Sequence, residues 1–312
     1  MSQSKKRSAK AIIAEAAREN TPVIRTICLT SGGGDSTVLA HQCRDLYDEL
    51  FHIDTGTALP GVRAFVEEFA DFIGKPLRVV EGKDAYRKLV LGYDEWWDIY
   101  KKYGKRDEGP DDFRLRISQL DTKEKRMAKL AHRAPMGFPG PAGHFYAYIA
   151  LKEKQLLTGL KAIKEEFGTG KQKQRVLLLS GVRMDESQRR KMHGAAQGYW
   201  ERRGNQVWVN PLLDWKNQEM AKYRRDQKLL ISDVTALTHR SGECNCLAFA
   251  TKDEPAFIRD MYPDWYTKYI EPLEQAAFEK GLKYWQWGWG AGQPPVGGVG
   301  PLCQGCEIAG RP

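Results

Sequence analysis

The chain has 312 residues, with 49 Lys and Arg against 40 Asp and Glu, which gives a formal net charge of +9. Hydrophobic residues make up 41% and aromatic residues 11% of the sequence, which excludes a disordered or fibrous chain and predicts one large or two smaller folded domains. No apolar run reaches the roughly 18–20 residues of a membrane span, and the N-terminal residues lack the apolar core of a secretory signal. We therefore expect a soluble, cytoplasmic protein.

Positive charge is concentrated in the first three quarters of the sequence. Residues 1–239 carry a net charge of +11, and residues 240–312 carry −2. Two segments are especially basic: residues 101–133 hold 11 basic and 6 acidic residues, and residues 171–191 hold 7 and 2. This distribution favours an anionic partner, such as a polyphosphate or a nucleic acid. Charged residues that only keep the surface soluble are the alternative.

The first predicted elements are two helices, a strand and a glycine-rich turn. Residues 8–20 have the pattern of a polar, basic helix. Residues 23–30 are rich in β-branched residues, as in a buried parallel strand, and residues 37–47 have the pattern of an amphipathic helix. The turn Ser31-Gly32-Gly33-Gly34-Asp35-Ser36 joins this strand to the second helix.

Strands and helices alternate further along the chain. We expect strands at residues 49–53, 77–80, 174–180 and 206–210, and helices at residues 61–73, 147–167 and 218–227. This alternation predicts an α/β fold with a doubly wound parallel sheet of the Rossmann-like kind. Residues 93–145 are expected to form helical insertions and loops.

The alternation fades after residue 240, where one further helix is expected at residues 270–280. We therefore predict three parts: an N-terminal basic helix at residues 1–22, a nucleotide-binding α/β domain at residues 23–239, and a C-terminal cysteine-containing subdomain at residues 240–312. Three tryptophans alternate near the end of the chain, at Trp285, Trp287 and Trp289. They are expected to pack over the cysteine site or to stack on nucleic-acid bases.

The glycine-rich turn has the composition of a phosphate-binding loop. Three glycines allow backbone N–H groups to approach phosphate oxygens, and the N-terminus of the following helix favours negative charge. Ser31 and Ser36 add hydroxyl donors. A tight turn with Asp35 or Ser36 as helix cap is the simpler alternative. The sequence has neither the Gly-x-x-x-x-Gly-Lys-Ser/Thr of a Walker A loop nor the Gly-x-Gly-x-x-Gly of a dinucleotide-binding turn.

The six cysteines fall into two groups. Cys28 and Cys43 lie in apolar segments and are expected in the core. The other four form two close pairs separated by 56 residues: Cys244 with Cys246, and Cys303 with Cys306. Four thiolates at this spacing predict a tetrahedral Zn²⁺ site or an iron–sulfur cluster. Structural disulfides fit poorly with a chain that shows no export signal.

Four motifs resemble the phosphoadenosine phosphosulfate (PAPS) reductase branch of the adenine-nucleotide α-hydrolase superfamily, the PP-loop ATP pyrophosphatases. In chain order they are Ser31-Gly32-Gly33-Gly34-Asp35-Ser36, His52-Ile53-Asp54-Thr55-Gly56, Gly181-Val182-Arg183-Met184-Asp185-Glu186-Ser187-Gln188-Arg189-Arg190, and Asn210-Pro211-Leu212-Leu213-Asp214-Trp215. The resemblance covers residues 23–230 and implies a PP-loop fold that binds an adenine nucleotide.

The resemblance also implies roles for the motif residues. The loop from Ser31 to Ser36 would bind the phosphates of ATP, or of PAPS or adenylylsulfate. Asp54, Thr55 and Gly56 would face adenosine, and the Asp54 carboxylate would hold Mg²⁺ or bond a sugar or base.

In the third motif, Gly181 would lie at the nucleotide, and Arg183 and Arg190 would bind a phosphate or sulfate. Glu186 would orient one of these arginines. Asp35, Arg183, Glu186 and Arg190 are thus the expected catalytic residues. In the fourth motif, Asp214 is expected to cap the following helix and Trp215 to lie in the core.

The C-terminus differs from that of thiol-using reductases, because the Glu-Cys-Gly-x-His that carries their nucleophile is absent. The nearer resemblance is to DNA phosphorothioation sulfurtransferases and tRNA-thiolating enzymes. This resemblance implies adenylylation of an acceptor, a nucleic acid or a small molecule, with release of pyrophosphate. Sulfur from a cluster or a sulfur-donor protein then displaces AMP. It also favours a [4Fe-4S] cluster over Zn²⁺ at the four cysteines.

Two other functions stay open. One is a sulfonucleotide reductase that acts on PAPS or adenylylsulfate. The other is a regulatory or nucleic-acid-binding module that binds a nucleotide without turnover.

Overall fold

The computed structural model describes residues 6–92, 102–103, 108–133, 137–140, 144–170, 173–186, 198–238, 240–248, 250 and 253–288. The described residues form two compact units. The first comprises residues 6–82 and 154–245, and the second comprises residues 83–153 and 246–288. The three-part division expected from the sequence stays a prediction.

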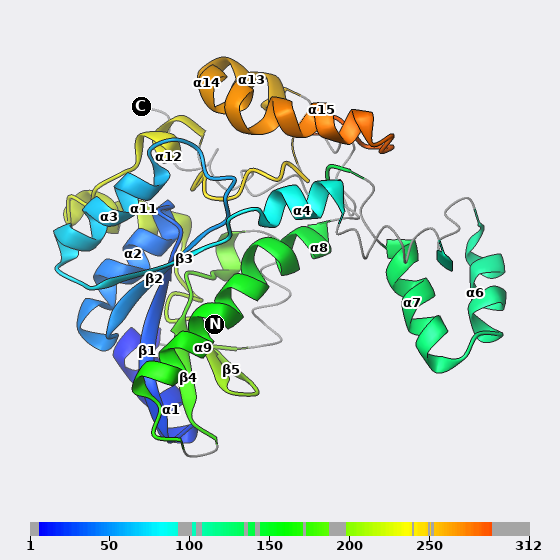
Figure 1. Ribbon diagram of the computed structural model, residues 1–312. Helices are drawn as coiled ribbons and strands as arrows, with labels where there is room; N and C mark the ends of the chain where they lie inside the picture. Colours follow the sequence, from blue (N-terminus) through cyan, green and yellow to red (C-terminus); the bar gives the residue numbers. More distant parts are fainter. Residues whose placement is uncertain are drawn as a thin grey trace, which may run out of the picture. The chain divides into compact units, whose positions relative to one another are not determined.

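A six-stranded sheet forms the centre of the first unit (Figure 1). Its strands are β1 (Val23–Thr30), β2 (Glu49–Asp54), β3 (Leu77–Glu81), β4 (Arg175–Leu179), β5 (Trp200–Arg203) and β6 (Gln206–Val209). Their order is β3-β2-β1-β4-β6-β5. All neighbouring strands are parallel except β5 and β6. The predicted α/β class is confirmed as a mixed α/β fold with a mostly parallel sheet.

The antiparallel strand β5 was not predicted. It is joined to β6 by Gly204 and Asn205 alone, and Gly204 has a φ of +62°, which suits a two-residue hairpin. The strand reads Trp-Glu-Arg-Arg, and its last two residues are exposed. Such a polar edge strand carries none of the hydrophobic signal by which the buried strands are recognised.

One face of the sheet packs against four helices: α1 (Ala9–Glu19), α2 (Gly34–Gln42), α3 (Val62–Ile73) and α11 (Asn217–Asp226). Cys28 and Leu50 point to this face from neighbouring strands, and Cys43 is buried among the same residues. Burial raises the pKa of Cys43 to about 12 and that of Cys28 well above its usual value. The expectation that both thiols lie in the core is confirmed.

Local sequence signals set the limits of these helices. The hydroxyl of Ser8 accepts a hydrogen bond from the N–H of Ala11 at 3.2 Å and so caps α1. In α3, apolar side chains recur every three or four residues and are buried. The helix ends at Gly74, which has a φ of +65°. The N–H of Lys75 there donates to Ala70 O at 3.0 Å, as in a Schellman motif.

Helix α9 (Lys154–Phe167) covers the opposite face of the sheet (Figure 1). Its Leu156, Leu160 and Ile163 pack with Phe51 and Leu178. With helices on both faces, Val176–Leu179 of the central strand β4 are fully buried, which explains the continuous hydrophobic sequence of this strand.

The second unit is helical. Its helices are α4 (Ala85–Leu91), α6 (Pro110–Ser118), α7 (Thr122–Arg133), α8 (His144–Tyr148), α13 (Glu254–Met261), α14 (Pro263–Trp265) and α15 (Glu271–Glu279). Of these, α6, α7 and α8 lie where helical insertions and a longer helix were expected, and α15 matches the prediction for residues 270–280. The shorter α4, α13 and α14 were not predicted.

Two of the three alternating tryptophans lie in described residues. Trp287 is 3% exposed and lies 5.7 Å from Trp265 between ring centroids. Trp285 is 37% exposed and has its ring edge against Phe278. Trp287 therefore packs against other aromatic side chains, and its packing over the cysteine site stays a prediction. Trp289 lies outside the described residues.

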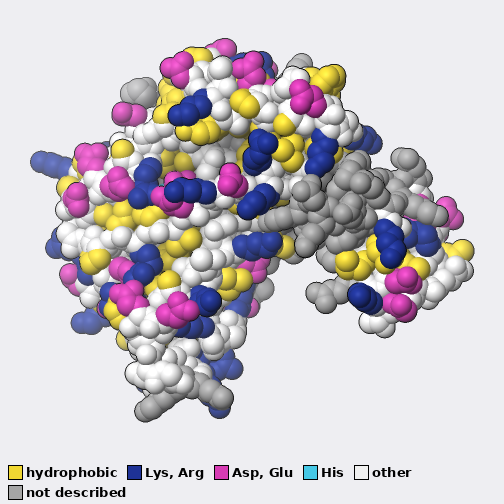
Figure 2. All heavy atoms as spheres, in the orientation of Figure 1, with side chains coloured by type: hydrophobic (Ala, Val, Ile, Leu, Met, Phe, Trp, Pro, Cys, Tyr) yellow, Lys and Arg dark blue, Asp and Glu magenta, His cyan; other side chains and the backbone are white. Residues whose placement is uncertain are grey.

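No helix of the described ranges is long and apolar enough to cross a membrane. Acidic and basic side chains are interspersed over the face shown in Figure 2.

Gly159 lets α9 lie directly on the sheet. A Cβ atom at this position would lie 2.6 Å from Phe51 Cε2 and 2.7 Å from Val80 Cγ2. In an open helix Gly→Ala would stabilise by about 1 kcal/mol. Here we expect Gly159→Ala to lower the free energy of unfolding by about 1–3 kcal/mol, because the methyl group overpacks the core. Urea unfolding measures the change.

The exposed Ala162 provides the matched control in the same helix. Ala162→Gly should cost about 1 kcal/mol through helix propensity alone. The close packing would be contradicted if Gly159→Ala raised the free energy of unfolding by as much as Ala162→Gly lowers it.

Candidate nucleotide site

The glycine-rich loop lies where the order of the strands reverses. It starts at Ser31, directly after β1, and α2 begins at Gly34. From β1 the chain moves to β2 and β3 on one side, and then returns to place β4 on the other side of β1. In parallel α/β sheets, ligands bind at this kind of reversal, outside the carboxyl ends of the strands.

The loop is closed by its own hydroxyl groups. Ser36 Oγ accepts the N–H of Ser31 at 3.2 Å and donates to Gly33 O at 2.9 Å. Ser31 Oγ lies 3.4 Å from Ser36 Oγ. Gly32 has a φ of +75°, a conformation that favours glycine. The turn therefore has a defined shape, and its N–H groups lie at the N-terminus of α2.

Gly181 brings the segment after β4 against the first turn of α2. A Cβ atom on Gly181 would lie 3.3 Å from the carbonyl carbon of Asp35 and 3.5 Å from Ser36 N. The first and third sequence motifs thus meet through their backbones. A larger residue at Gly181 would push the two segments apart.

Arg183 joins the same two segments through an ion pair with Asp35. Its Nε and Nη2 donate to Asp35 Oδ2 at 3.0 and 2.8 Å. Its Nη1 donates to Asn217 Oδ1 at 2.9 Å and to Trp215 O at 3.3 Å. Arg183 is 4% exposed. These contacts show that Arg183 positions Asp35 at the start of α2. The role of Arg183 as a ligand of a phosphate or sulfate stays a prediction.

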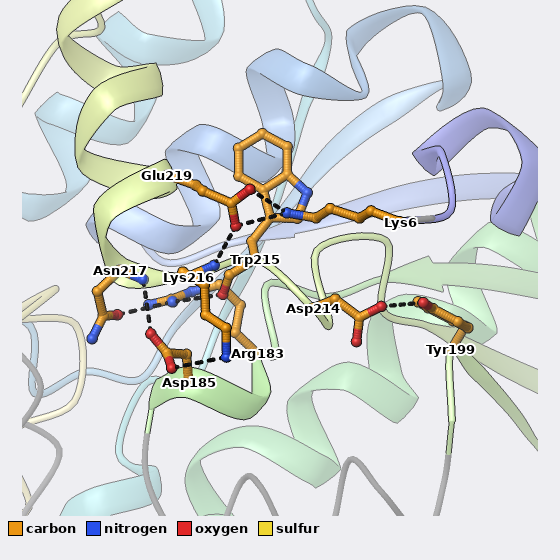
Figure 3. Close-up of polar contacts among 9 residues, drawn as sticks. All are labelled: Lys6, Arg183, Asp185, Tyr199, Asp214, Trp215, Lys216, Asn217 and Glu219. Carbon is orange, nitrogen blue, oxygen red and sulfur yellow. Dashed lines mark hydrogen bonds and ion pairs between the residues drawn. The ribbon is translucent and has the colours of Figure 1, made fainter. Parts of the chain in front are cut away.

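Asp185 caps helix α11, a role that was assigned to Asp214 from the sequence. Figure 3 shows the Asp185 carboxylate accepting the backbone N–H of Asn217, at 2.9 Å. This hydrogen bond is the main reason that the pKa of Asp185 is lowered. Asp214 instead accepts the hydroxyl of Tyr199. The sequence expectation for Asp214 is therefore wrong, because the capping acid comes from a distant segment that only the fold brings near.

The remaining residues of the third motif are only partly described. Glu186 lies in a 3-10 turn formed by Met184–Glu186 and is partly buried. Arg190 lies outside the described residues. The roles expected for both stay predictions. Trp215 is partly buried at the edge of the hydrophobic core.

The second motif lies at the carboxyl end of β2, next to β1. Asp54 Oδ1 accepts the N–H of Gly56 at 3.0 Å, which shapes the turn, and Asp54 Oδ2 lies 4.0 Å from Arg63 Nη1. Gly56 has a φ of +73°. The hydroxyl of Thr55 is fully buried and donates to Glu243 O at 2.5 Å. Thr55 thus holds the segment that carries the first cysteine pair.

This contact extends over the residues that follow. Thr57 and Cys244 form a parallel bridge. The side-chain amide of Asn245 donates to Thr57 O and to Gly242 O, both at 2.8 Å, and the backbone N–H of Asn245 donates to Thr57 Oγ1 at 3.1 Å. Sequence reasoning missed Thr57 and Asn245. A short polar residue between two cysteines was the only signal for Asn245.

The cysteine site is described for one pair only. Cys244 is partly exposed and Cys246 is buried. Cys303 and Cys306 lie outside the described residues. Within the residues that the structure describes, no three His, Cys, Asp or Glu side chains converge in a way that could hold a metal ion. The four-cysteine site therefore stays a prediction.

The fold and the loop together define a mixed α/β domain with a glycine-rich turn at the reversal of strand order. Residues 25–241 match the family model of the phosphoadenosine phosphosulfate reductase domain. The chain therefore belongs to this family, as its four motifs indicated. The comparison with curated proteins gives no match.

Two solved structures share a weaker likeness. A phosphoadenylyl-sulfate (PAPS) reductase from Candida auris, in a phosphate complex, is 15% identical with a TM-score of 0.42, over 76% of this chain and 94% of that chain. The U34-tRNA thiolase NcsA from Methanococcus maripaludis, with its [4Fe-4S] cluster, is 14% identical with a TM-score of 0.36, over 88% of this chain and 80% of that chain. At these TM-scores neither protein bears on the function of this chain.

A double-mutant cycle tests the ion pair between Asp35 and Arg183. Asp35→Ala should lower the free energy of unfolding by about 3 kcal/mol, because it leaves the buried charge of Arg183 without its partner. This value is the lower end of the range for buried pairs, since the Asp35 side chain is 30% exposed. Arg183→Ala should also destabilise. The double variant should lose less than the sum of the two, with a coupling of about 0.5–3 kcal/mol by urea unfolding.

The exposed pair of Arg203 and Glu201 is the control, with an N–O distance of 2.7 Å. Its coupling should stay between about 0 and 1 kcal/mol. Additive losses for Asp35 and Arg183 would show that they do not act as a pair.

Proposed function

We propose that this chain binds ATP at Ser31–Ser36 and transfers the adenylyl group to an acceptor, with release of pyrophosphate, as the first step of sulfur transfer. The observation that carries the proposal is the position of the glycine-rich loop. The loop directly follows β1, at the point where the strand order reverses and β4 lies on the other side of β1. Membership of the phosphoadenosine phosphosulfate reductase domain family supports an adenine nucleotide as the ligand.

The loop supplies the groups that phosphate binding requires. Backbone N–H groups of the glycines and the N-terminus of α2 favour a dianionic phosphate, and Ser31 adds a hydroxyl donor. Asp54, whose side chain is 27% exposed, presents carboxylate oxygens of the kind that Mg²⁺ prefers. These residues would hold the pyrophosphate part of the nucleotide and its metal ion, and Gly56 would face adenosine.

The reaction requires an oxygen nucleophile on the acceptor. This oxygen forms a bond to the α-phosphorus, the bond from that phosphorus to the bridging oxygen breaks, and pyrophosphate leaves with the electron pair. Catalysis of such a step depends on holding the phosphates in line and neutralising their charge. Hydrosulfide released by a sulfur-donor protein then forms a bond to the adenylylated atom of the acceptor, the bond from that atom to the oxygen of AMP breaks, and AMP leaves with the electron pair. The net charge of +9 supports a nucleic-acid acceptor over a small molecule.

The proposal for the cysteines is that Cys244, Cys246, Cys303 and Cys306 hold a [4Fe-4S] cluster, with Zn²⁺ as the alternative. The chemistry of the donors fits, because thiolates are the preferred ligands of both groups and Cys244 is partly exposed. A bound cluster would supply sulfur-transfer or redox chemistry. The hydrogen bonds of Thr55 and Thr57 would hold Cys244 beside the second nucleotide motif.

Pyrophosphate release tests the proposed reaction. With Mg-ATP and either duplex DNA or bulk tRNA, we expect release of pyrophosphate that depends on ATP and on the acceptor. Ser31→Ala should weaken ATP binding roughly 10- to 100-fold, because a hydrogen bond to a charged phosphate contributes about 1.5–3 kcal/mol. Isothermal titration measures the binding. Ser118→Ala, which removes an exposed hydroxyl, should leave it unchanged.

Two results would count against adenylylation, and a third would count against the role of Ser31. Release of sulfite from PAPS or adenylylsulfate with an external thiol would support a sulfonucleotide reductase. ATP binding without any turnover would support a regulatory module. Equal ATP affinity in the wild type and Ser31→Ala would remove Ser31 from the phosphate site.

Metal analysis tests the cysteine site. The full chain, purified without oxygen, should contain equal amounts of iron and sulfide and absorb blue light. Cys244→Ser should lose this absorption and its iron, whereas Cys43→Ala, at a buried cysteine of the core, should retain both. Stoichiometric zinc in a colourless protein would make the site structural. Full iron content in Cys244→Ser would show that Cys244 is not a ligand.

A further inference from the structure

Arg224 lies on α11 and reaches the first residue of α2. A Cβ atom on Gly34 would collide with Arg224 Nη1 and would lie 3.2 Å from Arg224 Cζ. The guanidinium group therefore occupies the space beside Gly34 that only a glycine leaves open. Gly34 is also the residue at which the phosphate-binding turn becomes a helix.

Contacts along α11 hold Arg224 in this position. Near the start of the helix, Asn217 Oδ1 accepts the hydrogen bond from Arg183. Near its end, the hydroxyl of Tyr223 lies 2.9 Å from His41 Nδ1 on α2. His41 follows Gly34 by seven residues, two helical turns, so both lie on the same side of α2. The helix is thus fixed to α2 directly beside Arg224.

The guanidinium group of Arg224 has no charged partner among the residues that the structure describes. Among the described residues, no side chain forms a hydrogen bond or an ion pair with the guanidinium group of Arg224. Arg183, by contrast, donates hydrogen bonds to Asp35, Asn217 and Trp215. A cation beside the positive end of a helix is unfavourable unless an anion lies between them. The arrangement therefore fits a negatively charged ligand at the loop.

We propose that Arg224 binds the polyphosphate chain of the nucleotide and makes the site selective for ligands that carry a pyrophosphate group. The inference rests on the proposed function and adds a residue that lies outside all four sequence motifs. The N–H groups of the loop hold one phosphate, and the planar guanidinium group holds oxygens of the next one. Nucleoside triphosphates and inorganic pyrophosphate have this second phosphate, whereas AMP does not.

Isothermal titration of the full chain with ATP, inorganic pyrophosphate and AMP tests the inference. Arg224→Ala should weaken the binding of ATP and of pyrophosphate at least about tenfold and change the binding of AMP less than about twofold. Arg224→Lys, which keeps a charge without the planar fork, should give intermediate affinities. Its similar length also keeps the test usable if Arg224→Ala unfolds.

Arg225→Ala is the matched control. Arg225 is the next residue in the last turn of α11 and is exposed, so its loss changes the net charge and the helix terminus in the same way. Its affinities should equal those of the wild type. If Arg225→Ala lost as much affinity for ATP and pyrophosphate as Arg224→Ala, the loss would reflect only the change in net charge, and the inference would be overturned.

The outcomes separate the two proposals. If the wild-type chain binds ATP and pyrophosphate and Arg224→Ala binds both equally well, the inference about Arg224 fails while the nucleotide site stands. A loss of the same size for AMP would also overturn the proposed selectivity. If the wild-type chain binds none of the three ligands, the nucleotide function fails, and this inference fails with it.

Discussion

The ion pair between Asp35 and Arg183 is the interaction on which the candidate site depends. It joins the first turn of α2 to the segment after β4, and Arg183 continues to Asn217 at the start of α11. Three segments that are far apart in the sequence therefore share one buried guanidinium group. Because a buried charge without its partner is costly, the pair fixes the geometry more strictly than apolar packing would. The pair therefore joins the start of α2, the segment after β4 and the start of α11, while the hydroxyl of Ser36 closes the loop itself.

Buried parallel strands were well predicted from the sequence. The strand from Val23 to Thr30 was placed at its observed limits, because it is rich in β-branched and apolar residues and a glycine-rich turn follows it. The glycine-rich loop was located for the same reason, since its residue types are set by local backbone geometry. Signals of this kind lie within a few residues of one another and need no knowledge of the fold.

Contacts between segments that are far apart in the chain could not be predicted from the sequence. Asp185 and Asp214 are both short acids that precede α11, and only the fold decides that Asp185 reaches its N-terminus. Asn245 and Arg224 are likewise ordinary polar residues in the sequence. Their roles depend on the position of Thr57 in one case and of Gly34 in the other. Asp185 lies 32 positions from Asn217, and these partners of Asn245 and Arg224 lie more than 180 positions away, so no local pattern marks these contacts.

The hairpin of β5 and β6 also affects how the protein behaves at high concentration. A strand at the edge of a sheet has unpaired backbone groups that can pair with another chain and start aggregation. Here the edge strand β5 is only four residues long and carries Glu201, Arg202 and Arg203. A second molecule would have to bring its own strand against these charges. The polar sequence of β5, which made the strand difficult to predict, thus protects its neighbours β6 and β4 from pairing with another molecule.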